Sequence, residues 1–541
     1  MAMERASGIL LHPTSLPGAL GCGDLGDDAY RFVDWLATAG QSLWQVLPLT
    51  PPGPGWSPYM SASTHAGNPL LVSTVRLERD GWLDAGASQR AWDASGSATQ
   101  RPSLAGADLP EDAAKPAVDH RDPARIDVTR VTAVREALLE KAAARFFGAA
   151  HAGGAARRAF EQWCAEQADW LDDHALFQAL DAAFAPGTWQ QWPAPLARRE
   201  PAALQAAFRD HALACRHHRF VQWCFDTQWR ALRRHAATRQ VRIVGDLPIY
   251  CALHSADVWV NPTLFELDAD LMPMAIAGVP PDYFSQTGQL WGNPLYDWRA
   301  HAADGYRWWI ERMRSAQRHA DIVRIDHFRG FAGYWSVPAH AATAIDGHWR
   351  PGPGRALFDA MRRAIGDVRD PLPIIAEDLG TITPDVIELR EALGFPGMAV
   401  LQFAFGDTAA NLYLPHNLQP ACVVYTGTHD NDTTRGWFAH ASALERKAVQ
   451  CYLESDGNEI EWDLIRAASS SVAALAIYPM QDVLGLDSAA RMNVPSLPGA
   501  QWRWRFDWSQ LGDWQAPRLA SLSRAHGRPM PCAPASWPAP Q

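Results

Sequence analysis

The stretch Asp-Ile-Val-Arg-Ile-Asp-His-Phe-Arg-Gly-Phe (residues 321–331) decides how the rest of the chain is interpreted. Its β-branched residues, bounded by polar ones, predict a short buried strand that ends at Asp326. Because side chains alternate along a strand, Arg324 and Asp326 lie on the same face, with a guanidinium beside a carboxylate. A cationic neighbour favours the ionised carboxylate that a nucleophile requires. On this stretch alone, a structural ion pair at a strand end is an equally good interpretation.

The composition is that of an ordinary globular protein, with 541 residues, 48% hydrophobic and 20% charged. The net charge of −11 and the lack of a long Lys/Arg run argue against a nucleic acid or an anionic membrane as partner. Eight scattered cysteines without a CxxC pair suggest reduced thiols, neither a disulfide framework nor a zinc site. No apolar stretch is long enough for a signal peptide or a membrane span. We therefore expect a soluble cytoplasmic protein.

Eight short apolar runs predict buried strands, most of them separated by helical or insertion-length segments. They are residues 8–15, 42–49, 241–249, 322–325, 373–379, 398–403, 423–430 and 474–480. This count and this alternation predict an α/β fold, a (β/α)8 TIM barrel whose functional groups cluster at the carboxyl ends of the strands.

The barrel is expected to carry large, mainly helical insertions at its C-terminal face. Residues 1–524 form a single catalytic barrel in this interpretation. A mainly helical insertion is predicted at about 75–240, between the second and third strands, where apolar residues recur at three- and four-residue spacing. A Pro/Gly/aromatic loop insertion is predicted at about 250–300, between the third and fourth strands, and residues 525–541 are expected to be a Pro-rich tail.

Three of the eight strands end in a carboxylate, the fourth at Asp326, the fifth at Glu377 and the seventh at Asp430. In a barrel, the carboxyl ends of all strands face one pocket. Two carboxylates that flank a bond can perform glycoside chemistry, one as nucleophile and one as general acid/base. Arg324 favours an ionised Asp326, whereas Glu377 follows an apolar run and could have the raised pKa that an acid requires. Asp430, with His429 beside it, could hold sugar hydroxyls.

Two further motifs suggest other chemistry. Gly-Cys-Gly-Asp-Leu-Gly (21–26) matches the dinucleotide pattern G-x-G-x-x-G, but the next strand ends in Thr50-Pro51-Pro52 without the acidic residue that this pattern needs. Asp-Asn-Asp (430–432) spells D-x-D, which binds a divalent metal in nucleotide-sugar transferases, although a turn after a strand is the commoner explanation. We interpret both as turns and expect no metal and no other cofactor.

Tryptophan is unusually frequent, with 25 residues, most of which we expect in the core. Trp56, Trp291, Trp437 and Trp508 lie in loop-like sequence beside Gly, Pro or Asn. Exposed rings next to polar side chains suit carbohydrate, because the C–H faces of sugars stack on aromatic rings.

Taken together, the motifs make a stronger case. In chain order they are Leu-His-Pro-Thr-Ser-Leu-Pro-Gly (11–18), Trp-Gln-Val-Leu-Pro-Leu (44–49), Ser-Pro-Tyr (57–59) with Gly-Asn-Pro (67–69), Gly-Asp-Leu-Pro-Ile (245–249), Gly-Gln-Leu-Trp-Gly-Asn-Pro (288–294), Arg-Ile-Asp-His-Phe-Arg-Gly (324–330), Ala-Glu-Asp-Leu-Gly (376–380) and Gly-Thr-His-Asp-Asn-Asp (427–432). From about residue 8 to 505, this set resembles the 4-α-glucanotransferase family (amylomaltase or disproportionating enzyme, glycoside hydrolase family 77), which is related to the α-amylases.

The resemblance implies a role for each matching residue. Asp326 matches the nucleophile, Glu377 the acid/base and Asp430 the transition-state stabiliser. The residues matching substrate-binding positions are Tyr59, Asp246, Gln289, Trp291, Asn293, Arg324, His429 and Asn493. The implied reaction is a retaining transfer of a segment of an α-1,4-glucan (maltodextrin) donor to the 4-hydroxyl of glucose or another maltodextrin. The loop at 250–300 would cover the acceptor side and exclude water.

The sequence departs from the family pattern near Tyr59, at Met60 and His65, and at Gln501, where asparagine is usual before Trp502. An α-glucan hydrolase with the same carboxylates and a non-catalytic maltodextrin-binding protein are the alternatives. Nothing in the sequence indicates an oligomeric state.

Overall fold

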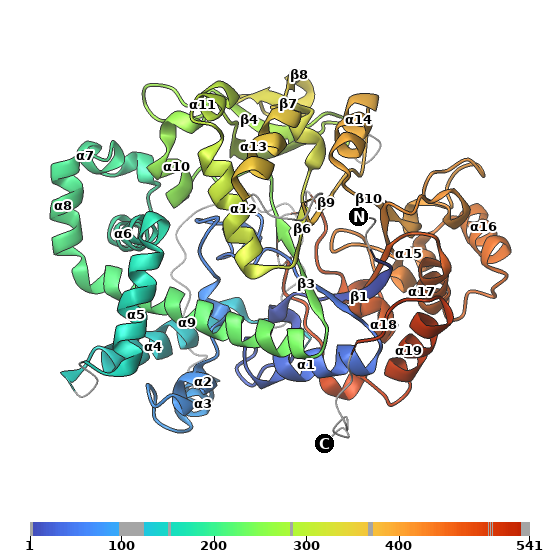
Figure 1. The fold of residues 1–541 in the computed structure, drawn as a ribbon, viewed down its shortest axis with the longest axis horizontal. Helices are drawn as coiled ribbons and strands as arrows, with labels where there is room; N and C mark the ends of the chain where they lie inside the picture. Colours follow the sequence, from blue (N-terminus) through green and yellow to red (C-terminus); the bar gives the residue numbers. More distant parts are fainter. Residues whose placement is uncertain are drawn as a thin grey trace, which may run out of the picture.

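Eight parallel strands form the centre of the fold, in a computed structural model that describes residues 4–96, 124–149, 153–281, 285–365, 372–495, 497, 499 and 501–531 (Figure 1). Their order is β10-β11-β12-β1-β2-β3-β6-β9. The strands are β1 (Ala6–Leu10), β2 (Leu43–Gln45), β3 (Arg242–Leu247), β6 (Ile322–Ile325), β9 (Ile374–Ala376), β10 (Gly397–Val400), β11 (Cys422–Tyr425) and β12 (Leu475–Pro479). The two edges meet where the N–H of Ala376 donates a 3.0 Å hydrogen bond to the carbonyl of Pro396, so the predicted barrel is confirmed.

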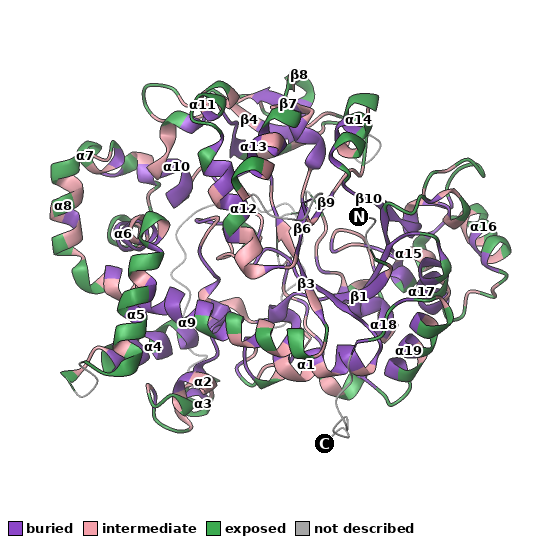
Figure 2. Ribbon diagram, viewed as in Figure 1, coloured by how far each residue is buried: buried purple, intermediate pink, exposed green. Residues whose placement is uncertain are grey.

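Helices surround the barrel and shield most of its strand residues from solvent. Every residue of β1, β2, β6, β9, β10, β11 and β12 is buried, and Figure 2 shows the helices exposing their outer faces. The main outer helices are α1 (Asp27–Thr38), α9 (Ala212–Thr238), α12 (Arg307–His319), α13 (Arg355–Ile365), α14 (Pro384–Leu393), α17 (Ile460–Ser470) and α19 (Gln515–Ala525). Further helices on the β11–β12 side are α15 (Thr434–His440), α16 (Ala443–Leu453) and α18 (Met480–Leu484).

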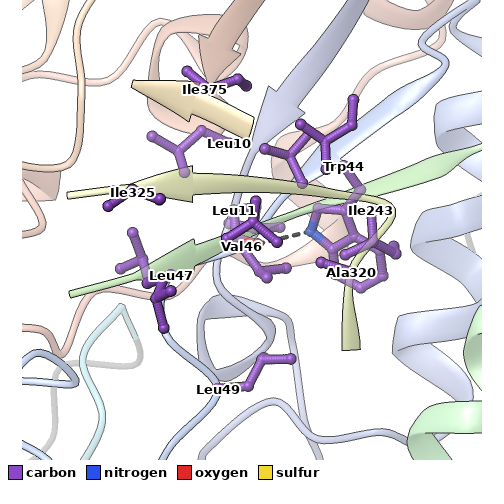
Figure 3. Packing of buried hydrophobic residues seen from close by; sticks show 14 of the residues in the cluster. Leu10, Leu11, Trp44, Val46, Leu47, Leu49, Ile243, Ala320, Ile325 and Ile375 are labelled. Carbon is purple, nitrogen blue, oxygen red and sulfur yellow. Dashed lines mark hydrogen bonds between the residues drawn. The ribbon is translucent and has the colours of Figure 1, made fainter. Parts of the chain in front are cut away.

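Large apolar side chains fill the space around the ends of β2, β3 and β6 (Figure 3). Trp44 in β2 is fully buried, and its indole N–H donates a 2.8 Å hydrogen bond to the carbonyl of Leu11. Gly245 in β3 allows a close approach, because a Cβ there would lie 2.7 Å from the Cβ of Ala320. This packing fixes the positions of the strand ends, and the polar residues of the predicted site lie at or just beyond these ends.

A mainly helical segment connects β2 to β3, as predicted, and lies to one side of the barrel (Figure 1). Its helices are α2 (Thr74–Arg79), α3 (Ala87–Gly96), α4 (Val128–Phe146), α5 (Ala155–Glu166), α6 (Ala168–Phe184), α7 (Ala194–Ala197) and α8 (Pro201–Asp210). An aromatic cluster that includes Trp82, Phe146, Phe160, Phe220 and Trp223 packs α4 and α5 onto α9. α9 also packs on α1 and β3, so the end of the predicted insertion belongs to the outer helical layer of the barrel.

A second, antiparallel sheet was not predicted. Its order is β5-β4-β7-β8, with β4 (Ala275–Val279), β5 (Gln289–Pro294), β7 (Gly333–Pro338) and β8 (His348–Pro351). The interpretation of residues 250–300 as a loop is therefore wrong in part, because this range contains β4, β5, α10 (Ala256–Val260) and α11 (Trp298–Ala303). The short strand β4, Ala-Ile-Ala-Gly-Val, is defined by its pairing with β7, which follows β6 in the chain.

The predicted C-terminal tail begins later than expected. α19 ends at Ala525, and Arg528 is still buried, with hydrogen bonds to the carbonyls of Ala6 and Ala474 at the amino ends of β1 and β12. The rest of the predicted tail, from residue 532, lies outside the described residues. Among the helices in the described ranges, none is both long and apolar enough to cross a membrane.

Candidate active site

The three predicted carboxylates all follow barrel strands at their carboxyl ends. Asp326 directly follows β6, Glu377 directly follows β9, and Asp430 lies on the loop after β11. β6 and β9 are neighbours in the sheet. The backbone N–H of His327 donates a 2.6 Å hydrogen bond to Glu377 Oε2, which joins the segments that carry Asp326 and Glu377. The barrel therefore brings these side chains to one end, as the sequence predicted.

Arg324 is the centre of a buried charge network. The β3–β6 register places Arg324 beside Asp246, and its Nη1 donates to both carboxylate oxygens of Asp246 at 2.7 and 2.8 Å. Its Nη2 donates to Asp326 Oδ1 at 3.0 Å, the contact expected from strand alternation. Tyr59 completes the network with a 2.7 Å hydrogen bond from its hydroxyl to Asp246 Oδ2. Although burial opposes it, the carboxylates of Asp246 and Asp326 raise the pKa of Arg324, so this cation stays charged.

Asp326 and Glu377 are inequivalent carboxyl groups. Burial raises the pKa of Asp326, and the guanidinium of Arg324 opposes this rise. Burial, followed by the nearby charge of Asp326, raises the pKa of Glu377 to about 7, against the N–H groups of Leu379 and His327 that bind its carboxylate. Glu377 is thus the carboxyl whose pKa is raised to about 7, and Asp326 is the carboxyl that binds a guanidinium.

His327 has a left-handed backbone conformation, with φ 51° and ψ 48°. This conformation is costly for a residue with a Cβ, so surrounding contacts must hold it. It aims the N–H of His327 at Glu377, and the imidazole ring packs edge-on against Trp291 at 4.7 Å. The sequence did not single out His327 as a site residue, because its contribution is a backbone group.

Asp430 is held by groups that stabilise its charge. Although burial opposes it, the imidazole of His429 and the amide of Asn493 lower the pKa of Asp430 to about 2. Asn493 Nδ2 donates to Asp430 Oδ1 at 2.6 Å, and His429 Nε2 lies 3.3 Å from Oδ2. Arg491 donates to the carbonyl of Asp430 at 2.5 Å. Asp430 is therefore a fixed anion.

An aromatic wall adjoins this anion. The rings of Tyr59 and His429 stack with centroids 5.2 Å apart, and Trp502 lies 5.6 Å from Tyr59 and 5.7 Å from His429. Trp502 was not predicted as a site residue. In the sequence, Trp502 is marked as a candidate only by its place in the segment after Asn493. Its contact with Tyr59, which is distant in sequence, shows that it adjoins the site.

The predicted residues of β5 divide into two groups. Trp291 faces His327, and its indole N–H donates to Gln289 Oε1 at 3.2 Å. Asn293 is buried, and its amide donates to the carbonyl of Cys251 at 2.8 Å. The structure thus brings Gln289 and Trp291 toward the segment after Asp326 but directs Asn293 into the loop that follows β3, where its side chain binds the backbone.

The two alternative motifs form turns. Asp432 accepts hydrogen bonds from the N–H of Thr433 in its own loop and from the hydroxyl of Ser488 in the segment after α18. Within the described ranges, no group of three His, Cys, Asp or Glu residues is arranged to hold a metal ion. In the glycine motif, Asp24 binds the N–H of Gly26 at 2.8 Å and pairs with Arg135 of α4 at 2.8 Å, which attaches the helical segment to the barrel.

Comparisons with known proteins agree with this geometry. A family model described as 4-alpha-glucanotransferase, glycoside hydrolase family 77, matches residues 11–510. The chain is 46% identical over 531 residues to a 4-alpha-glucanotransferase from Synechocystis sp., covering 98% of this chain and 99% of the relative. A 4-alpha-glucanotransferase from Thermus thermophilus is 43% identical, with coverages of 98% and 100%. Among solved structures, the amylomaltase from Streptococcus agalactiae in complex with acarbose superposes with a TM-score of 0.87 at 36% identity, covering 97% of this chain and 100% of that one.

Proposed function

The chain belongs to the 4-alpha-glucanotransferase family, glycoside hydrolase family 77, and we propose that Asp326, Glu377 and Asp430 carry out its transfer reaction by retaining double displacement. Its activity is that of a glycosyltransferase acting on α-1,4-glucans. The observation that carries the mechanism is the pair of inequivalent carboxyls, one beside a guanidinium and one with its pKa raised to about 7.

In the first step, ionised Asp326 attacks the anomeric carbon of the donor glucan. Protonated Glu377 gives its proton to the leaving glycosidic oxygen, and the reducing-end piece departs as an alcohol. Glu377 can hold this proton near neutral pH because burial and the charge of Asp326 disfavour its ionised form. The product of this step is a covalent glucosyl ester on Asp326.

In the second step, the 4-hydroxyl of glucose or of another maltodextrin takes the place of the departed piece. Glu377, now ionised, accepts the proton of this hydroxyl as the oxygen attacks the anomeric carbon and releases Asp326. Bond formation on the face opposite to the ester restores the original α configuration. Both steps pass through a transition state with positive charge on the sugar, which the fixed anion Asp430 stabilises.

Substrate binding is proposed for Tyr59, Asp246, Arg324, His429 and Asn493 around the reacting sugar. Tyr59 and His429 present stacked rings, which suit the apolar face of a glucose unit. The buried charges of Asp246 and Arg324 are satisfied by each other, so they orient Asp326 and Tyr59 without competing for the sugar.

Gln289 and Trp291 are proposed to form the acceptor side. Trp291 lies against His327, next to the nucleophile, where its ring can exclude water after the first product leaves. Water exclusion is what separates transfer from hydrolysis, because both reactions use the same carboxylates. Asn293 is left out of this group, since its amide is bound to the carbonyl of Cys251.

The partners proposed are a maltodextrin or other α-1,4-glucan donor and a glucose or maltodextrin acceptor. A cytoplasmic location is proposed from the cysteines, because all seven in the described part of the chain are free and most are buried. Three of the relatives carry the words chloroplastic/amyloplastic in their names, so the compartment differs among relatives.

Incubation with maltotriose tests the proposal. Transfer yields glucose and a ladder of longer maltodextrins with little net increase in reducing ends. Steady growth of reducing ends with glucose and maltose as the main products would instead indicate a hydrolase. Binding of maltotriose without any product would indicate a non-catalytic maltodextrin-binding protein.

A further inference from the structure

Two loops that leave the barrel carry the proposed nucleophile and acid/base, and they are cross-linked by hydrogen bonds. The N–H of His327 binds Glu377 Oε2 at 2.6 Å, and the N–H of Phe328 binds the carbonyl of Glu377 at 2.9 Å. A third link uses a side chain, because Arg329 Nη1 donates to the carbonyl of Thr381 at 2.5 Å. Arg329 therefore spans from the loop after Asp326 to the loop after Glu377.

Arg329 is buried, and few neighbouring groups stabilise its positive charge. The side chain is 7% exposed, and its Nε has no hydrogen-bond partner in the described part of the chain. Burial lowers the pKa of Arg329, opposed by the carboxylate of Asp385 at the start of α14. A buried guanidinium that is only partly satisfied is costly, so the contacts that hold Arg329 in this position require an explanation.

The second sheet holds Arg329 from the other side. The guanidinium carbon lies 3.8 Å from the ring centroid of Trp349 in β8, a stacked cation–π contact. Trp349 pairs across the sheet with Trp335 in β7, and their rings meet edge to face at 5.1 Å. Trp335 is itself fixed by a 2.9 Å hydrogen bond from its indole N–H to the carbonyl of Ala344.

The same sheet touches the nucleophile loop at a second point. Trp291 in β5 packs on His327, two residues before the Arg329 that Trp349 covers. The loop after Asp326 thus contacts two tryptophans of the same sheet, Trp291 and Trp349. Through these two contacts, the sheet can influence the geometry of the Asp326–Glu377 pair. Arg329 is the side chain that reaches across to the loop after Glu377.

We propose that Arg329, stacked on Trp349, is a positioning residue that fixes Glu377 relative to Asp326. The inference rests on the proposed function of these two carboxyls. Arg329 contacts no reacting atom in this scheme. It acts by keeping the Glu377 loop in the place where the N–H groups of His327 and Leu379 bind the carboxylate.

The pH profile reports this role. The groups that face Glu377 are Asp326 and Arg324 from β6 and Tyr413 from the segment after β10, besides the two N–H groups. Burial and the charge of Asp326 are the largest causes of the raised pKa of Glu377, so a loop that moves away from Asp326 and admits water lowers this pKa. Because Glu377 donates its proton in the first step, the alkaline limb of kcat/KM must then move to lower pH.

The test compares Arg329→Met, Arg329→Lys, Trp349→Phe and Trp349→Leu with the wild-type chain in maltotriose transfer. The matched control is Arg130→Met, because Arg130 also stacks on a tryptophan, Trp92, at 3.6 Å and also donates to a carbonyl, but in the helical segment. Values of kcat and KM are measured between pH 5 and 9, and thermal unfolding confirms the fold of each variant.

Arg329→Met should lower kcat by about 10- to 100-fold with little change in KM, as expected for a small displacement of a catalytic group. Its alkaline midpoint should fall by roughly half a pH unit or more. Trp349→Leu should change kcat and the alkaline midpoint in the same directions as Arg329→Met. Trp349→Phe keeps an aromatic ring and should therefore keep most of the wild-type kcat. Arg329→Lys keeps the charge without the planar stack and should remain impaired.

A folded Arg329→Met variant with an unchanged kcat and an unchanged alkaline midpoint would overturn the inference. An equal effect of Arg130→Met would also overturn it, by showing a general loss of stability. Should Arg329→Met fail to fold, Trp349→Leu decides by the same two quantities. A wild-type chain that does not transfer maltotriose at all would contradict the proposed function instead.

Discussion

Arg324 donates two hydrogen bonds to Asp246, at 2.7 and 2.8 Å, but only one, at 3.0 Å, to the neighbouring Asp326. The side chain of Asp246 is fully buried, whereas that of Asp326 is 30% exposed. A carboxylate whose oxygens are both bound by a cation has little electron density left for attack on carbon. Asp246 takes up this bidentate pairing, so Arg324 is neutralised and positioned while Asp326 keeps one carboxylate oxygen that Arg324 does not bind.

Replacing Asp246 by asparagine therefore tests the network. Asp246→Asn leaves the buried charge of Arg324 without its main partner, which should cost about 3 kcal/mol or more in the free energy of unfolding. Arg324 should then turn toward Asp326 and lower kcat. Urea denaturation and maltotriose transfer measure the two effects. Asp84→Asn, in an exposed pair with Arg145, is the control and should leave stability unchanged. Wild-type stability and kcat in Asp246→Asn would refute the assignment.

Asp326→Asn should abolish transfer without unfolding the chain, because the amide keeps the shape of the side chain but cannot form the glucosyl ester. We expect kcat to fall by at least about a thousandfold. Removing the charge of Asp326 should also lower the pKa of Glu377, since that charge is one of the causes of its rise. Circular dichroism checks the fold, and an NMR titration follows the carboxyl of Glu377. Appreciable residual transfer, beyond deamidation, would exclude Asp326 as the nucleophile.

The pH dependence follows from the protonated form of Glu377. The first step needs a proton on Glu377, so kcat/KM for maltotriose should fall as the pH rises through about 7, the pKa to which burial and Asp326 raise this group. Asp430, with its pKa lowered to about 2, stays ionised throughout this range. The check is the profile of Glu377→Gln, which should be much slower and should lose the alkaline limb. Transfer from α-maltosyl fluoride, whose leaving group needs no proton, should be impaired less than transfer from maltotriose. An unaltered alkaline limb in Glu377→Gln would assign it to another group.

The sequence predicts the barrel because its strands are buried on both faces and therefore read as short apolar runs, as in Ile322–Ile325. The second sheet lacks this signal. β4 is Ala-Ile-Ala-Gly-Val with a register irregularity against β5, and its other partner, β7, comes only after β6. Pairing between segments so distant in the chain is a tertiary property that no local pattern contains.

The carboxylates of the site are predictable for a related reason. Asp326 and Glu377 directly follow buried strands, and a parallel barrel gathers all such ends. The orientation of a side chain beyond a strand end is not predictable in this way, as Asn293 shows by bonding to Cys251. Trp502 and Arg329 owe their places to contacts with residues distant in sequence, Tyr59 and Trp349.

Trp502 should contribute to binding of the reacting sugar, because its ring completes the wall formed by Tyr59 and His429. Trp502→Ala removes the support of both rings and should lower kcat/KM for maltotriose by roughly tenfold, in line with the loss of aromatic contacts. Steady-state kinetics measure this effect. Trp514→Ala is the control, because Trp514 is 46% exposed beside α19 and touches no site residue. Equal losses in the two variants would show that Trp502 has no specific role.

The balance between transfer and hydrolysis should depend on Trp291. Its ring packs on His327 at 4.7 Å, beside the proposed glucosyl ester of Asp326, so Trp291→Ala should open a path for water. We expect the rate of new reducing ends, divided by the rate of transfer from maltotriose, to rise severalfold. The adjacent residue offers a matched control, because Leu290 lies on the opposite face of β5 and is 37% exposed. Leu290→Ala should leave the ratio unchanged. If Trp291→Ala slowed both reactions by the same factor, the ring would bind substrate without excluding water, and another group would have to protect the ester.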